Sequence, residues 1–440
     1  MTNDSEPKAS RMRPRPGRLI RNAVALMISA GGTSVIGVIF WGVATHLAPA
    51  SSIGRDSAEI VAMTLLANLA QLSFGSIFER FLPVAGTQTR AFVKRAYSMC
   101  VSVALVLATV YVLLGFSHSF LPTSIQWRIL FVVAVALWTI FVLQDSALVG
   151  LRATRWVPVE NILFALMKLA LLPVCIAASA GQGVFVAWMA PVVLAIIAMT
   201  WYLFGKRIPD HEASSSAHEK VPTTRELFLL AGAQYATLLL NVFSPSIVTL
   251  IVIERLGPVA NAHYYVPALI AGSLAVLLYS ISRSFLVEAS HEPYALRRHA
   301  KSTIRAMTWL LMPCVVIGEI FAPEFLRIFG ASYAEHGATL LRMLLLSLPL
   351  SAISIFYSAF AWLDRRVWWM AIRDVISVAI YFTVILTQIA HVGIEAIGIA
   401  AVVSSGLQAI LFLPISIRRY RMTTNFTPPT SGTITQAAGT

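Results

Sequence analysis

Twelve long apolar runs constrain this chain more than any other feature of its sequence. A helix needs about 20 mostly apolar residues to cross a bilayer, and inside lipid each run must be helical because its backbone polar groups find no water. The predicted spans are 23–45, 60–84, 94–116, 128–149, 157–179, 183–204, 227–251, 262–285, 303–323, 339–363, 367–389 and 394–416.

The composition agrees with lipid as the solvent. Of the 440 residues, 58% are hydrophobic and 12% are charged, whereas a soluble domain carries about 25% charged residues. We therefore expect an all-α integral membrane protein with about twelve transmembrane helices. No metal-ligand spacing and no phosphate-binding or hydrolase motif is present, which predicts a protein that is not an enzyme and has no cofactor.

The distribution of basic residues predicts the orientation. With the N-terminus inside, 25 of the 33 Lys and Arg residues fall in inside segments, 5 fall outside and 3 lie within spans. This bias follows the positive-inside rule and places both termini in the cytoplasm. It also explains the net charge of +13 without nucleic acid as a partner and is compatible with contact to anionic membrane lipid.

A polar segment divides the spans into two groups of six. We expect a basic cytoplasmic tail over 1–21, an N-lobe over 22–205, a linker over 206–225, a C-lobe over 226–418 and a second tail over 419–440.

Lys168 is the sharpest candidate for function. It lies near the middle of the fifth span, and an ionised group at that depth costs at least about 3 kcal/mol. Glu160 is eight residues away on the same helix, a rise of about 12 Å that is too long for direct pairing. Lys168 therefore needs an acidic partner on another helix, a water-filled cavity or an anionic substrate.

A second group of charges is expected near the cytoplasmic ends of the spans. Glu79 and Arg80 end the second span, Asp145 ends the fourth and Glu160 begins the fifth. They either line a polar vestibule that binds or couples an ion, or extend to the interface. In the second lobe, the matching residues are Arg283 and Glu288.

The seventh span contains Asn241 and Pro245. Proline removes a backbone hydrogen bond and kinks a helix, so Pro245 is a predicted hinge and Asn241 a predicted cavity residue. A kink tolerated by neighbouring helices is the alternative.

Four segments resemble one transporter family. They are FERFLPVAG (78–86), LQDSALVGLRATRWVPVENILFALMKLALLP (143–173), FLVEAS (285–290) and FAPEFLRIFGASYAEHGATLLRMLLLSLP (321–349). Together with the division into six and six spans, they resemble the polysaccharide and O-antigen flippases, the Wzx-like branch of the multidrug/oligosaccharidyl-lipid/polysaccharide (MOP) exporter superfamily.

The resemblance implies two six-helix lobes around a central cavity that works by alternating access. The implied cargo is a polyprenyl-(pyro)phosphate-linked glycan, and the implied location is the bacterial cytoplasmic membrane. Polysaccharide polymerase and glycosyltransferase machinery are the implied partners, with a coupling ion or the membrane potential as the energy source. Arg80, Asp145 and Lys168 fall on matching segments, and Arg283 precedes one.

Three alternatives are open. A drug/cation antiporter of the same superfamily would share the fold, but 22–46 contains no Asp or Glu. A facilitator-type sugar transporter usually carries G-x-x-x-D-R-x-G-R-R after the second span, which this chain lacks. A glycan polymerase or ligase would need a large external loop, and 321–337 is short.

If Lys168 binds an anionic headgroup, Lys168→Ala should slow translocation of lipid-linked glycan in proteoliposomes because the cation that attracts the phosphate is lost. Translocation at the wild-type rate would contradict the role of Lys168.

Overall fold

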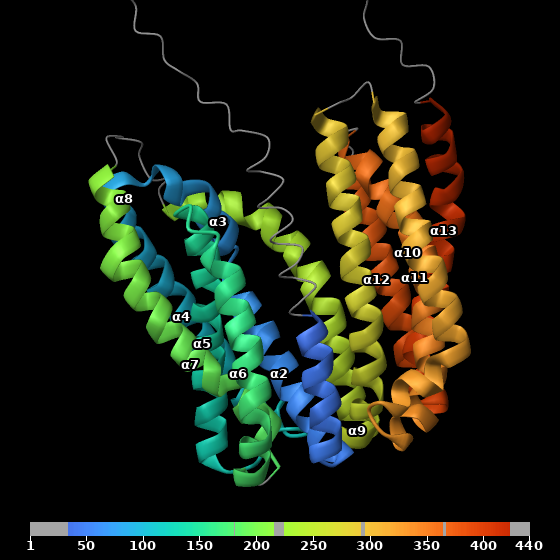
Figure 1. Cartoon of the computed structure of the whole chain (residues 1–440), viewed down its shortest axis with the longest axis horizontal. Helices are drawn as coiled ribbons and strands as arrows, with labels where there is room; N and C mark the ends of the chain where they lie inside the picture. The colour runs from blue at the N-terminus through green and yellow to red at the C-terminus, as the bar shows by residue number, and fades with distance from the viewer. Residues whose placement is uncertain (1–33, 180, 215–223, 292–294, 364–366, 423–440) are drawn as a thin grey trace, which may run out of the picture.

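The structure is a computed structural model that describes residues 34–179, 181–214, 224–291, 295–363 and 367–422. The described chain is helical almost throughout (Figure 1). After a helix over Ser34–Leu47, the main helices are α2 (Ala50–Ala70), α3 (Phe74–Phe81), α4 (Thr89–Leu113), α5 (Ile125–Gly150), α6 (Trp156–Ala178), α7 (Gly183–Tyr202), α8 (Ile208–Ser214), α9 (Thr224–His291), α10 (Leu296–Arg327), α11 (Ala331–Leu363), α12 (Val367–Val392) and α13 (Glu395–Met422).

The helices are long and apolar enough to make this a multi-pass membrane protein. Within the described residues, nine helices could each cross a bilayer, and the bent pair α2 and α3 would make ten. The helix Ser34–Leu47 is shorter, and α9 contains two arms that meet at Gly257, where φ is 85°. Twelve passages with both ends in the cytoplasm stay a prediction.

The helices pack in two groups that lie on opposite sides of the molecule (Figure 1). We call the helix Ser34–Leu47 with α2–α7 the N-lobe and α9–α13 the C-lobe. Each lobe has a buried apolar cluster between its own helices, and a larger cluster contains residues of both lobes. Helix α13 continues to Met422, so it runs past the predicted start of the second tail at 419. The other predicted boundaries stay predictions.

The lobes meet where α2 packs against α9. The amide of Asn261 donates to the Gly54 carbonyl at 2.8 Å and to the Ser57 hydroxyl at 3.2 Å. Nearby, the rings of Trp41 and Tyr265 lie 4.7 Å apart. Away from this junction the lobes diverge toward the end that carries α8 and the C-terminal end of α13 (Figure 1).

The second predicted span differs from expectation. It begins ten residues earlier, at Ala50, and it is broken between α2 and α3, which are bent by 50°. Leu72 and Ser73 have φ of 47° and 62°, values that cost a non-glycine residue energy. The Cys100 thiol donates to the Gln71 carbonyl beside the break, so one carbonyl freed by the broken helix has a partner.

Gly54→Ala should destabilise the lobe junction. A Cβ at Gly54 would lie 1.7 Å from the Pro258 carbonyl oxygen, and because that atom is backbone, the two helices must move apart. Overpacking of this kind costs about 1–3 kcal/mol, measurable by thermal unfolding in detergent. The control is Gly272→Ala on α9, where nothing lies within 4 Å. Equal melting temperatures for the two variants would contradict the close contact.

Candidate functional site in the N-lobe

Lys168 lies on α6 inside a cage of aromatic rings. Its side chain is 5% exposed. The Nζ atom lies 3.5 Å from the centroid of the Trp188 ring and 5.0 Å from those of Phe40 and Phe164. No carboxylate forms a salt bridge with Lys168 in the described part of the chain. An ammonium group over an aromatic face is stabilised by about 2 kcal/mol when it is desolvated.

The cage differs from the three environments expected for Lys168. Its rings come from three helices: Phe40 from Ser34–Leu47, Phe164 from α6 itself and Trp188 from α7. In this conformation the cation is partnered by rings rather than presented to an anionic substrate.

Asp56 is a buried carboxylate that the sequence analysis missed because the second span was placed from residue 60. Its Oδ2 accepts from the backbone N–H groups of Val184 at 2.9 Å and Phe185 at 3.3 Å. These are the second and third residues of α7. Since the first N–H groups of a helix lack intrahelical partners and carry a partial positive charge, the carboxylate stabilises the start of α7.

Glu59, one turn further along α2, has no such partner. Its side chain is 0% exposed, and neither oxygen accepts a hydrogen bond from any described residue. An unpaired carboxylate in an apolar interior is costly, so a buried acid of this kind takes up a proton or a cation.

Asp145, Glu160 and Asn161 form the second buried cluster. The Asn161 amide donates to the Asp145 carboxylate at 3.2 Å and to the Val157 carbonyl at 3.0 Å. Glu160 is 3% exposed, and its carboxyl group lies close enough to Asp145 to interact electrostatically. The hydroxyl of Tyr97 on α4 is also buried without a hydrogen-bond partner among the described residues.

This cluster is short of positive charge. Both Glu160 oxygens and Asp145 Oδ1 are buried without a hydrogen-bond partner in the described residues. Two adjacent carboxylates repel each other in a low dielectric, so the arrangement favours uptake of a proton or a small cation. The described residues contain no group of three or more metal-binding side chains.

The other predicted site residues do not join these clusters. Glu79 and Arg80 are exposed at the end of α3, with Arg80 5.2 Å from the Phe81 ring centroid. Arg283 is exposed, and Glu288 pairs with His299 at 3.0 Å.

The predicted hinge lies in the first arm of α9. The helix continues through Pro245, and its non-helical residue is Gly257. The hinge role of Pro245 therefore stays a prediction, and the Asn241 side chain lies outside the described set.

An apolar chamber of about 820 Å³ lies where the N-lobe helix Ser34–Leu47 faces the C-lobe. Val38, Gly42 and His46 line one side. The other side comes from α9, α10 and α11, including Leu274 and Phe325. Its size and lining suit an apolar or amphipathic molecule.

No protein-family model and no curated protein matches the chain. Solved structures do. A multidrug resistance MATE family transporter of the MOP superfamily in its inward-facing conformation is 15% identical, with a TM-score of 0.62 over 92% of this chain and 100% of that chain. The outward-facing conformation of such a transporter is 14% identical, with a TM-score of 0.57 over 94% and 98% of the two chains.

A third match is a MOP superfamily transporter from Pyrococcus furiosus for which a reversed polarity of the binding pocket suggests a different function. It is 14% identical, with a TM-score of 0.51 over 92% of this chain and 97% of that chain. At these identities the likeness concerns the fold. The chain therefore has the fold of the MOP superfamily transporters, which accords with a two-lobed membrane protein.

The aromatic cage predicts a measurable coupling between Lys168 and Trp188. In a double-mutant cycle with Lys168→Met and Trp188→Leu, unfolding free energies in detergent should give a coupling of about 1–2 kcal/mol. Trp138→Leu is the control because its ring lies 6.2 Å from Trp188 and is not among the rings over Lys168. Coupling to Trp188 no larger than coupling to Trp138 would refute a stabilising cation–π contact.

Proposed function

We propose that the chain is an alternating-access exporter in which a proton or small cation taken up at Asp145 and Glu160 drives movement of cargo between the lobes. The unpartnered, buried carboxyl group of Glu160 carries this proposal. Because its charge is costly inside the lobe when unpaired and tolerable when neutralised, ion binding biases which packing of the N-lobe is stable.

The cargo that fits best is an amphipathic, cationic small molecule of the kind a multidrug exporter carries. Two observations favour it over an anionic cargo. Glu59, Asp145 and Glu160 are buried acids without a basic partner in the described chain, whereas the buried cation Lys168 is already held by aromatic rings. The fold is also that of solved multidrug transporters.

The lack of Asp and Glu in 22–46 does not argue against a multidrug exporter once the buried acids of the structure are known. Acids on the second helix, Asp56 and Glu59, and the acid pair on α5 and α6 place carboxyl groups inside the same lobe. A coupling site can therefore be built without one in the first span.

Flipping of a polyprenyl-(pyro)phosphate-linked glycan is the second candidate. The apolar chamber of about 820 Å³ between the helix Ser34–Leu47 and the C-lobe favours it, because a prenyl chain needs an apolar path beside the lipid. In this mechanism Lys168 would leave its aromatic cage to meet the phosphate. Polymerase and glycosyltransferase partners, and location in the bacterial cytoplasmic membrane, are proposed with it.

The coupling site is tested by ethidium efflux from proteoliposomes under imposed proton or sodium gradients. Glu160→Gln should abolish the dependence on the gradient because the amide carries no titratable charge. Glu79→Gln, which removes an exposed acid of the same lobe, should leave it unchanged. Gradient-driven efflux by Glu160→Gln at the wild-type rate would exclude Glu160 as a coupling residue.

Labelled lipid-linked oligosaccharide in the same proteoliposomes separates the two cargos. Efflux of ethidium without movement of the glycan supports the exporter. Movement of the glycan without ethidium efflux would replace it with the flippase.

A further inference from the structure

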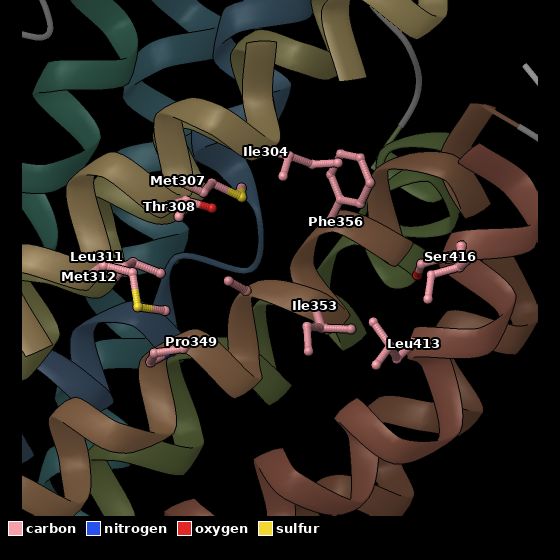
Figure 2. A pocket seen from close by; sticks show the side chains of 12 residues that line it. Ile304, Met307, Thr308, Leu311, Met312, Pro349, Ile353, Phe356, Leu413 and Ser416 are labelled. Carbon is pink, nitrogen blue, oxygen red and sulfur yellow. The ribbon is translucent and has the colours of Figure 1, made fainter. Parts of the chain in front are cut away.

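An apolar groove crosses the C-lobe away from the buried charges. It lies between α10 and α13, with α11 as its floor, and has a volume of about 250 Å³. Figure 2 shows the side chains that face it, which are almost all apolar and include Met307, Leu311, Ile353, Phe356 and Leu413. An apolar groove in a membrane protein is a place for a hydrocarbon chain.

One buried polar atom in the groove lacks a partner. Ser416 on α13 is 6% exposed, and its hydroxyl forms no hydrogen bond with any described residue. It lines the groove with the apolar side chains (Figure 2). A helical serine ordinarily bonds to its own backbone when nothing else is offered, so the free hydroxyl here is available to donate to a ligand that carries a hydrogen-bond acceptor.

A second hollow of about 400 Å³ joins one end of the groove. Lys301, Arg305 and Trp309 line it, and Ile304 and Thr308 line both hollows. Lys301 and Arg305 are exposed and form no salt bridge within the described chain. Trp309 is 74% exposed, as aromatic residues at a membrane interface commonly are.

The order of these features along α10 matches that of a phospholipid. Lys301 and Arg305 lie in the first three turns of the helix, and Met312 lies seven residues beyond Arg305, a depth of about 10 Å. The basic side chains therefore lie near the N-terminal end of α10, and the apolar side chains lie further along the helix. The C-terminal end of α13, with Ser416, lies at the same end of the bundle (Figure 1).

We infer that this groove binds a phospholipid with a negatively charged headgroup from the leaflet at the α8 and α13 end, which the charge distribution predicts to be cytoplasmic. Lys301 and Arg305 hold the phosphate, the Ser416 hydroxyl donates to an ester carbonyl, and an acyl chain lies over Met307 and Leu311. The two basic residues provide the selection for an anionic headgroup. The inference does not depend on the proposed transport function.

The test is native mass spectrometry of the delipidated full chain titrated with phosphatidylglycerol. The wild type should retain one lipid, and phosphatidylcholine with the same acyl chains should bind more weakly. Arg305→Ala should reduce occupancy about fivefold, the effect of one basic residue at a membrane surface. Lys94→Ala, which removes an exposed cation from the N-lobe, is the matched control and should bind as the wild type does.

A second variant tests the groove itself. Ala352 lines the groove, so Ala352→Phe fills the groove without altering a charge and should also displace the lipid. Ser416→Ala removes only the hydroxyl, so it gives the same test if the larger side chain prevents folding. Thermal unfolding in detergent shows which variants fold.

Three outcomes would overturn the inference. Equal occupancy in Arg305→Ala and Lys94→Ala would remove the headgroup site. A loss in Arg305→Ala with unchanged occupancy in both Ala352→Phe and Ser416→Ala would reduce the site to surface charge. Binding of glycerol phosphate, which lacks acyl chains, as tightly as phosphatidylglycerol would make it an anion site without a role for the acyl chain.

Discussion

The N-lobe is organised by the cost of enclosing charge in an apolar interior. Two buried charged groups have partners that offset this cost, and a third site does not. The Asp56 carboxylate accepts backbone N–H groups at the start of α7, and the Lys168 ammonium lies over the rings of Trp188, Phe40 and Phe164. Asp145 and Glu160 keep oxygens without a partner within the described chain. The first two arrangements are satisfied and stabilise one packing, whereas the third is the site whose charge state, in the proposed mechanism, changes that packing.

In the proposed mechanism, this change of packing acts at the junction of the lobes. Gly54 and Ser57 let α2 approach the backbone of α9, and Asn261 bonds across the contact. Small residues that permit close helix contact are common where membrane helices associate. Because the lobes diverge away from this contact (Figure 1), a small tilt at α2 and α9 becomes a larger movement at the α8 and α13 end. The break between α2 and α3 lies on the path from the junction to that end.

The sequence predicted the coarse architecture because hydropathy is summed over about 20 residues and tolerates local error. It also identified Lys168 as a buried cation whose nearest acid on the same helix, Glu160, is eight residues away. The sequence could not predict the aromatic cage, because Phe40 and Trp188 are apolar residues that could equally face lipid. Only the packing of three helices brings their rings to Lys168. The break at Leu72 and Ser73 has no proline, whereas Pro245, which suggested a break, lies within a continuing helix. Asp56 and Glu59 were missed because a charged turn looks like the end of a span until its partners are known.

The central claim is that occupancy of Asp145 and Glu160 sets the distance between the lobes. Spin labels on Ala213→Cys in α8 and Ser302→Cys in α10, both exposed positions, report that distance in a background from which the three native cysteines have been removed. In double electron–electron resonance, the account predicts two distance populations whose ratio shifts with pH or sodium in the wild type and is fixed in Glu160→Gln. One unchanging distance in the wild type, or the same shift in Glu160→Gln, would contradict it.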